Sequence, residues 1–262
     1  MYSFVRLATL VLVAAAAVAC DSTPVQWTEP VPINEVDGPT RLIISPGGGA
    51  TLVADSATPA TAPPSSGLCV SSLRTIPGSI HLFSAWWNVR ADSSAALLIA
   101  SSADSGKSWG AAIAMDTTDV ASAGCNRPPP SVATVGDDLF VAYSMAAPEG
   151  KGVFFAHLMG AMVHTPVPVI YGDRLVPTAI ATQADDVAVA YEDPNGPRKR
   201  VAVAFSRAQG HIFDWHTIAS RDVDVATAPA VALNGRELAV AWMERPTGDS
   251  TTTRIVRVGR IQ

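Results

Sequence analysis

The sequence has little charge. Asp, Glu, Lys and Arg make up 16% of its 262 residues, and the formal net charge is −5. The one cluster of cations, at residues 198–200, follows the residues DPNG and is typical of a solvated turn rather than of a nucleic-acid-binding face. Because 48% of the residues are hydrophobic, the chain can bury a substantial core. We therefore expect a folded protein that has no nucleic acid partner.

Metal-ligating side chains are few and scattered. The chain has three cysteines and five histidines, and His211 and His216, five residues apart around Trp215, do not form an HExxH-type arrangement. No spacing among these residues matches a known metal-binding motif. The sequence predicts neither a metal site nor a cofactor.

Aromatic residues are also scarce, at 6%, whereas the chain contains 19 Gly and 20 Pro. Gly and Pro favour tight turns and disfavour long helices. This composition predicts many short elements joined by turns.

The first twenty residues differ in character from the rest. Arg6 precedes the apolar run LATLVLVAAAAVA, which is short for a membrane-spanning helix and ends in small residues before Cys20. This pattern predicts an export signal peptide over residues 1–19. The residues AVAC resemble a bacterial lipobox, with Ala17 where Leu is commonest, and the resemblance implies that Cys20 is acylated and becomes the mature N-terminus. The alternative is an ordinary cleaved signal peptide.

A lipidated Cys20 makes the membrane a partner of the protein. Residues 20–24 would form the lipidated cysteine and a short tether, and residues 25–262 would form a single domain, expected to be a monomer. The acidic domain is repelled by an anionic leaflet, so the acyl chains would have to hold it there. We expect an exported protein anchored to a bacterial membrane, on the periplasmic face or the cell surface.

Four segments of the chain repeat one pattern. Each alternates apolar side chains and ends in Ala plus an aromatic residue, and the aromatics, about fifty residues apart, are Trp86, Tyr143, Tyr191 and Trp242. A weaker copy, GATLVAD, begins at Gly49. Extended runs flank each copy across turns such as GD and NG, and period-2 alternation around such turns predicts β-hairpins.

Four strands recurring about every fifty residues are the signature of a β-propeller blade. The sequence therefore predicts an all-β propeller of four-stranded antiparallel blades. The chain ends in TRIVRVGRIQ, a third strand without a fourth, and VQWTEPVPI at residues 25–33 would supply the missing strand and close the last blade. This assignment gives five blades, with a degenerate first blade at about residues 40–66, or four if the Gly49 copy is an insertion.

The residues SSADSGKSW, 101–109, fall between the third and fourth strands of one blade. They resemble the Asp-box, Ser-x-Asp-x-Gly-x-Thr-Trp, of the sialidase-like, bacterial neuraminidase repeat family, with Ser108 in place of Thr and matches at Ser102, Asp104, Gly106 and Trp109. Physically this is a turn in which Asp accepts backbone N–H bonds, Gly adopts a left-handed conformation and Trp packs between blades. The resemblance implies a propeller and a structural marker at the blade periphery, not a catalytic site. Residues 206–215 hold the same place two blades on and keep Ser206, Gly210 and Trp215.

Two cysteines remain in the expected domain. Cys69 and Cys125 each begin the innermost strand of consecutive blades in this assignment, so they would lie side by side. In the oxidising compartment that an exported protein reaches, such a pair is more often a disulfide than a metal site. We expect a Cys69–Cys125 disulfide.

Ligands of propellers bind at the channel mouth, in the loops that enter the innermost strands and those that join second to third strands. Charged residues recur in these loops, and guanidinium groups with carboxylates can bind sugars or acidic groups. The candidate ligand-binding residues are Arg127, Asp173, Arg174, Arg221 and Asp224. Trp87, expected to be exposed beside Trp86, is a candidate stacking platform, the alternative being that it packs on the neighbouring blade. Surface loops are polar in any protein, which is the structural alternative for all of these residues.

The function that these features favour is a recognition module for a glycan or an envelope protein at the channel mouth. A sialidase-like glycoside hydrolase is the first alternative, but of the tyrosines in the expected domain only Tyr171 lies near a loop mouth, beside Asp173 and Arg174, and the sequence places no carboxylate pair at glycosidase spacing. A structural scaffold in an envelope complex is the second alternative. We assign no catalytic residue, and the sequence favours a binding protein over an enzyme.

Overall fold

The computed structural model describes residues 24–37, 40–54, 61–221, 225–246 and 248–262, and within them the chain forms strands and a single turn of 3-10 helix, η1 (Val70–Ser72). The strands form five antiparallel sheets. Cys20 and the expected signal peptide lie outside the described residues.

Two of the sheets come from the first half of the chain. The first is a two-stranded hairpin, β3 (Thr40–Ile44) and β4 (Ala50–Ala54). The second has four strands in sequence order, β5 (Arg74–Pro77), β6 (Leu82–Val89), β7 (Ala95–Ser102) and β8 (Ile113–Asp116).

The other three sheets follow the same up-and-down order. The third contains β9 (Ser131–Val135), β10 (Asp138–Ala147), β11 (Gly150–Met159), and both β12 (Met162–Val163) and β13 (Val167–Tyr171) beside β11. The fourth contains β14 (Thr178–Gln183), β15 (Asp186–Glu192), β16 (Val201–Ser206) and β17 (Trp215–Ile218). The fifth contains β18 (Val225–Asn234), β19 (Glu237–Arg245) and β20 (Thr253–Ile261).

The N-terminal segment completes the fifth sheet, as the sequence predicts. Strand β1 (Val25–Trp27) pairs antiparallel with β20, with Val25 opposite Ile261, and β2 (Val31–Pro32) pairs with the same strand further along. Gly259 permits this closure, because a Cβ there would lie 2.4 Å from the Val25 side chain. The beginning and the end of the domain are thereby fastened to one another.

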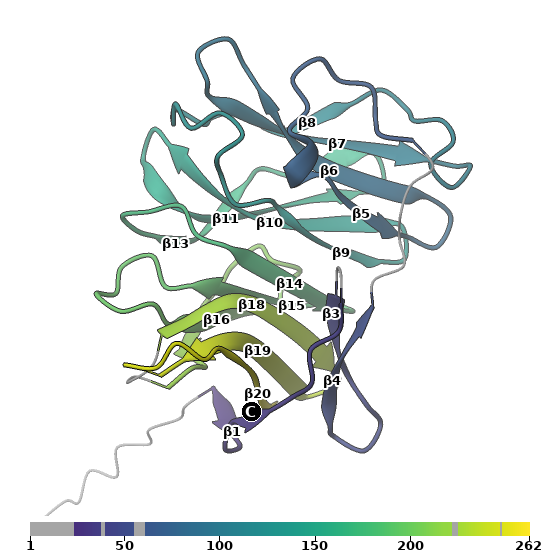
Figure 1. Cartoon of the computed structure of the whole chain (residues 1–262). Coiled ribbons are helices and arrows are strands. Elements are labelled where there is room, and N and C mark those ends of the chain that lie inside the picture. Colours follow the sequence, from purple (N-terminus) through teal and green to yellow (C-terminus); the bar gives the residue numbers. More distant parts are fainter. Residues whose placement is uncertain (1–23, 38–39, 55–60, 222–224, 247) are drawn as a thin grey trace, which may run out of the picture.

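Figure 1 shows the sheets lying next to one another, with the β3–β4 hairpin beside the β18–β20 sheet. A channel lies between the sheets. Its wall contains one strand from each of the five sheets, namely β3, β5, β9, β14 and β18. The fold is therefore a β-propeller with four-stranded antiparallel blades. The number of blades, predicted to be five, stays a prediction, because the β3–β4 sheet has two strands.

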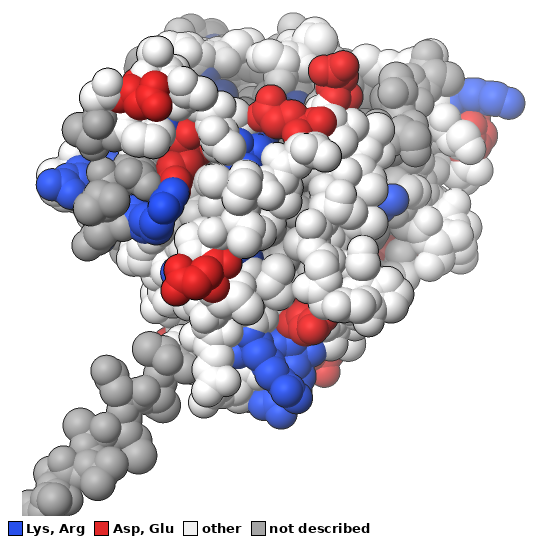
Figure 2. Space-filling model, turned by 60° about the horizontal axis from the view of Figure 1, so that its bottom comes forward, with Lys and Arg blue, Asp and Glu red and all other residues white. Residues whose placement is uncertain are grey.

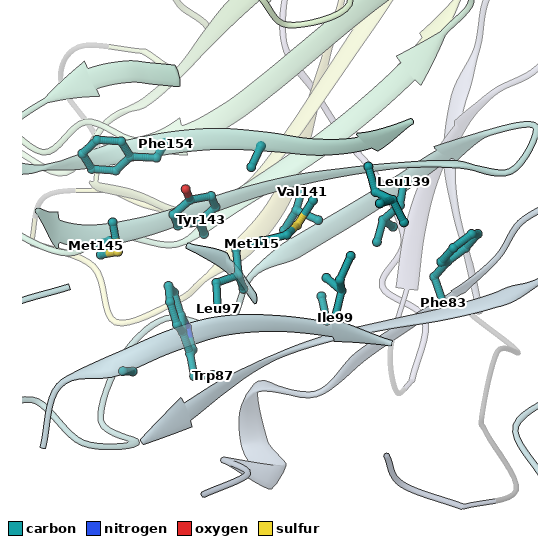
Figure 3. Packing of buried hydrophobic residues seen from close by; sticks show 14 of the residues in the cluster. Phe83, Trp87, Leu97, Ile99, Met115, Leu139, Val141, Tyr143, Met145 and Phe154 are labelled. Atoms are coloured by element: carbon teal, nitrogen blue, oxygen red, sulfur yellow. The ribbon is translucent and has the colours of Figure 1, made fainter. Parts of the chain in front are cut away.

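The core lies between the sheets, and period-2 alternation builds it. In β10, Leu139, Val141 and Tyr143 pack against the β5–β8 sheet, while Phe140 and Ala142 pack against the β14–β17 sheet. Figure 3 shows the first of these layers, with side chains of β6 and β7 facing those of β10. Because both faces of a blade are covered, nearly every residue of its central strands is apolar. The repeat aromatics predicted from the sequence, Trp86, Tyr143, Tyr191 and Trp242, are all buried.

Candidate ligand-binding channel and its mouth

The channel between the innermost strands is a hollow that could hold a ligand. It has a volume of about 780 Å³, within the size range of ligand sites. Small and hydroxyl-bearing side chains line much of it, including Thr75, Ser131, Thr134, Thr178 and Thr182. Several of these hydroxyls bond to one another or to the backbone, as Ser131 and Thr178 do at 3.1 Å between two adjacent sheets.

Only two charged side chains line the channel in the described ranges, and both are arginines, Arg41 and Arg74. Arg74 donates from Nη1 to the carbonyls of Ser71 and Leu73, and burial lowers its pKa. Arg41 lies on β3, is exposed, and has no side-chain partner among the described residues. Sequence reasoning singled out neither residue.

Arg127, a predicted ligand-binding residue, is buried instead. Its side chain and that of Asp119 are both 0% exposed, and Nη1 lies 2.9 Å from the Asp119 carboxylate. Arg127 also donates to the carbonyls of Gly124 and Ala121, and Asp119 accepts the Ala95 backbone N–H at 2.9 Å. The pair joins the loop before β9 to the start of β7, and Arg127 is covered from solvent.

The expectation that Trp87 is exposed is wrong. Trp87 is 0% exposed, packs edge-on against Tyr143 with ring centroids 5.9 Å apart, and lies under the Arg127 guanidinium at 5.2 Å. Its Nε1 donates to the Pro128 carbonyl at 2.8 Å. The alternation of β6 turns Trp87 toward the next blade, which is the packing alternative, so it offers no stacking face to a ligand (Figure 3).

Asp173 and Arg174 do lie in an exposed loop, between β13 and β14. Arg174 donates from Nη2 to the carbonyls of Asp193 and Gly196, at 2.8 and 2.9 Å, which fastens this loop to the one between β15 and β16. Tyr171 beside them is 45% exposed and rests edge-on against Phe154. Asp173 and Tyr171 therefore remain accessible at the surface.

Arg221 is half-exposed and forms an ion pair with Glu244, which is buried. Glu244 also accepts the Trp242 Nε1–H at 3.0 Å. Asp224 lies outside the described residues. The structure thus places Arg127 in a buried ion pair, bonds Arg174 to a neighbouring loop and Arg221 to Glu244 of β19, and leaves Asp173 exposed.

Acidic and basic side chains are interspersed among uncharged ones on the face that Figure 2 shows. None of the described helices is long and apolar enough to cross a bilayer.

The turn at residues 102–109 has the local geometry that its residues predict. Asp104 accepts the Ser108 backbone N–H at 2.8 Å and the Ser108 and Ser102 hydroxyls, and Gly106 has a φ of 81°. These bonds, led by that of the Ser108 hydroxyl, lower the pKa of Asp104 to about 2. Trp109 donates from Nε1 to the Thr61 carbonyl at 2.9 Å. Asp104 is thus committed to the turn.

The turn after β16 repeats this geometry without the aspartate. The Ser206 hydroxyl accepts hydrogen bonds from the N–H groups of Ala208 and Gly210. In the same way, the Ser102 hydroxyl accepts hydrogen bonds from the N–H groups of Asp104 and Gly106. Gly210 has a φ of 83°, close to that of Gly106. Its approach to Phe155 leaves no room for a side chain, since a Cβ would lie 2.1 Å from that ring.

The predicted disulfide is present. Cys69 and Cys125 are bonded, with Cα atoms 5.4 Å apart. Each cysteine lies in the loop that leads into an innermost strand, β5 and β9, so the bond ties two neighbouring blades together.

The sequence reasoning missed one cluster of chemically active side chains. Imidazole nitrogens of His157, His164 and His211 all lie within 4.8 Å of one another. A signal existed for the first two, since HLMGAMVH places them symmetrically about the turn residues Gly160 and Ala161. His211 comes from another blade, and sequence spacing carries no trace of that contact.

No protein-family profile matches the chain, and no curated protein matches it. Several solved structures resemble it in part. A protein of unknown function from Dyadobacter fermentans is 12% identical, with 91% of this chain and 100% of that chain covered and a TM-score of 0.48. The Trypanosoma rangeli sialidase, in complex with the inhibitor DANA, is 10% identical, with 82% of this chain but 40% of that chain covered and a TM-score of 0.47. An α-L-arabinofuranosidase from Podospora anserina, in complex with cellotriose, is 8% identical, with 91% and 98% covered and a TM-score of 0.45.

Proposed function

We propose that this protein is an exported, lipid-anchored recognition module that binds a glycan in its channel. The observation that carries the proposal is the channel itself, about 780 Å³ in volume and lined by strands of all five sheets. Hydroxyls and backbone groups on rigid strands suit the many hydroxyls of a saccharide, because they are already held in place before the ligand arrives.

Binding is favoured over hydrolysis by the chemistry of the wall. Glycoside hydrolysis generally requires two carboxyl groups that flank the scissile bond. Among the described residues that line the channel, none is Asp or Glu. A saccharide in the channel would therefore meet hydrogen-bonding groups and cations without an acid and base pair.

The two arginines indicate the kind of glycan. A guanidinium group binds a carboxylate or sulfate through two parallel hydrogen bonds. Arg41 has its donors available, and Arg74 keeps Nη2 after its Nη1 bonds. We infer that the preferred ligand carries an acidic group, as a uronic acid does.

The test is calorimetric titration with oligosaccharides of uronic acids and with neutral oligosaccharides of equal length, followed by chromatography of the mixture. The acidic ligand should bind and be recovered intact, and Arg41→Ala should weaken its binding by about tenfold or more, since a charge-assisted hydrogen bond contributes about 1.5–3 kcal/mol. Arg260→Ala removes another exposed strand arginine that lies outside the channel, and this variant should bind the ligand like the parent.

Three results would contradict the proposal. Shortened sugars would indicate a hydrolase, equal binding by Arg41→Ala would place the ligand elsewhere, and binding of no oligosaccharide would favour a protein ligand or a scaffold role.

The anchor is tested separately. Four residues separate Cys20 from Val25, the first residue of β1, so a lipid on Cys20 would hold the propeller within about 18 Å of the membrane surface. The Cys69–Cys125 disulfide supports export, because such bonds persist in oxidising compartments. Cells expressing the parent should incorporate labelled palmitate into the protein and retain it in the membrane fraction, whereas Cys20→Ala should abolish both. An unlabelled parent protein would indicate an ordinary cleaved signal peptide.

A further inference from the structure

Three of the five histidines of the chain meet at the junction of two blades. His157 is near the end of β11, His164 directly follows β12, and His211 belongs to the turn between β16 and β17. The ring centroids of His157 and His164 are 4.2 Å apart, and those of His157 and His211 are 5.0 Å apart. None of the three lines the channel, so this cluster is separate from the proposed glycan site.

Two local structures bring these rings together. The β11–β12 hairpin turns at residues 160–161 and places His164 opposite His157, with the His164 N–H donating to the His157 carbonyl at 3.0 Å. Period-2 alternation puts His157 on the same face of β11 as Phe155, toward the β14–β17 sheet. The turn that Ser206 and Gly210 form rests on Phe155 and so carries His211 to the same place.

The environment of His157 calls for a ligand. The residue is 1% exposed, and its Nε2 is buried without a hydrogen-bond partner in the described part of the protein. Buried polar atoms in folded proteins are nearly always paired, so an orphan beside two further imidazoles requires an explanation.

We propose that His157, His164 and His211 form a binding site for a divalent transition metal of the zinc class. Imidazole is a preferred ligand for Zn²⁺, Cu²⁺ and Ni²⁺, whereas Mg²⁺ and Ca²⁺ require oxygen ligands, and the cluster consists of imidazoles alone. Zn–N bonds of about 2.0–2.1 Å imply ligand nitrogens roughly 3.3 Å apart in a tetrahedral site. His164 is half-buried and His211 exposed, so both rings can close from the present spacing onto an ion at His157.

The site would do two things. With three protein ligands, the fourth position on the metal faces solvent beside the exposed His211 and is open to water or to a ligand atom from another molecule. The ion would also join the third sheet to the fourth at their outer ends, because His157 and His164 belong to one and His211 to the other. Metal binding would therefore stabilise the contact between two blades.

The experiment uses the tag-free domain, stripped with a chelator and titrated with Zn²⁺ by calorimetry, with Co²⁺ absorption as a second readout of tetrahedral nitrogen coordination. We expect one Zn²⁺ per chain and no binding of Mg²⁺ or Ca²⁺. His164→Ala and His211→Ala should each weaken Zn²⁺ binding by at least about tenfold. Removing a group that only hydrogen-bonds to a metal ligand typically lowers affinity about 10–100-fold, and removing the ligand itself should lower it by no less.

His81→Ala is the matched control. The His81 side chain is 39% exposed and pairs with Asp137 on another blade, so its loss should leave Zn²⁺ binding unchanged. Circular dichroism on each variant separates loss of ligands from loss of fold, and the exposure of His211 makes that variant the safest. The proposal fails if the parent binds no Zn²⁺, or if folded His164→Ala and His211→Ala bind it as the parent does.

Discussion

Loss of the Cys69–Cys125 disulfide should lower the free energy of unfolding by roughly 4 kcal/mol. The two cysteines are 56 residues apart in the chain. In the loop-closure model, a crosslink lowers the entropy of the unfolded chain by about 2.1 + 1.5R ln n cal/mol/K, where n is the number of residues in the loop. For this loop the decrease is about 14 cal/mol/K, which corresponds to ~4 kcal/mol at 25 °C. The effect acts mainly on the unfolded state, because reduction frees a segment that includes the whole β5–β8 sheet.

The assay is urea unfolding followed by tryptophan fluorescence, with Cys20 replaced so that no third thiol interferes. Cys69→Ala/Cys125→Ala should unfold at lower urea than the oxidised parent and with a steeper dependence on urea, because the uncrosslinked unfolded chain exposes more surface. The parent reduced with dithiothreitol provides the matched control and should agree with the double variant. A loss below about 1 kcal/mol would refute the loop-entropy reasoning, and two free thiols in the exported protein would refute the bond itself.

Three further outcomes follow from the contacts described above. Arg127→Met should lower the unfolding free energy by about 3–5 kcal/mol, because it leaves a buried carboxylate unpaired; a loss below about 1 kcal/mol in urea unfolding would contradict this. Trp27→Ala should destabilise the domain by about 1–3 kcal/mol through β1, because Trp27 is half-buried, whereas Gln26→Ala, exposed on the same strand, should change it by no more than about 0.5 kcal/mol; equal losses would show that β1 does not close the propeller through its tryptophan. NMR titration should find the pKa of Asp104 at about 2, below the ordinary value of 3.8. The ionised Asp104 carboxylate therefore stabilises the fold fully above pH 4, and this stabilisation is lost as the pH falls toward 2. Ser108→Ala should raise the pKa of Asp104, and an unchanged pKa would rule out the Ser108 hydroxyl as the main cause of the shift.

The repeat and the alternation it carries were sufficient to predict the fold. Each copy of the pattern became the second strand of a sheet, and the strand around Trp27 paired with the last strand as its position required. The disulfide followed from the same register, because equivalent positions in consecutive blades lie side by side. These features depend on local periodicity and on the order of strands, which a linear pattern records.

The candidate site was predicted less well. Arg127 lies in a loop and Trp87 near a strand end, where polar or exposed side chains are the usual expectation. In the structure Arg127 packs on Trp87 and pairs with Asp119 of its own loop, and Trp87 packs on Tyr143 of another blade. The sequence could not show that these partners were near, and so could not distinguish a binding arginine from a buried one.

What the sequence determined by itself is the type of each element, because side-chain period and turn chemistry act between near neighbours in the chain. Tertiary structure alone decided which side chains share a site: Arg41 and Arg74 both line the channel, and His211 lies beside His157 across two blades. Those distances depend on how one sheet packs against the next, and close contact between blades is set by shape and volume over the whole interface, which no local pattern encodes.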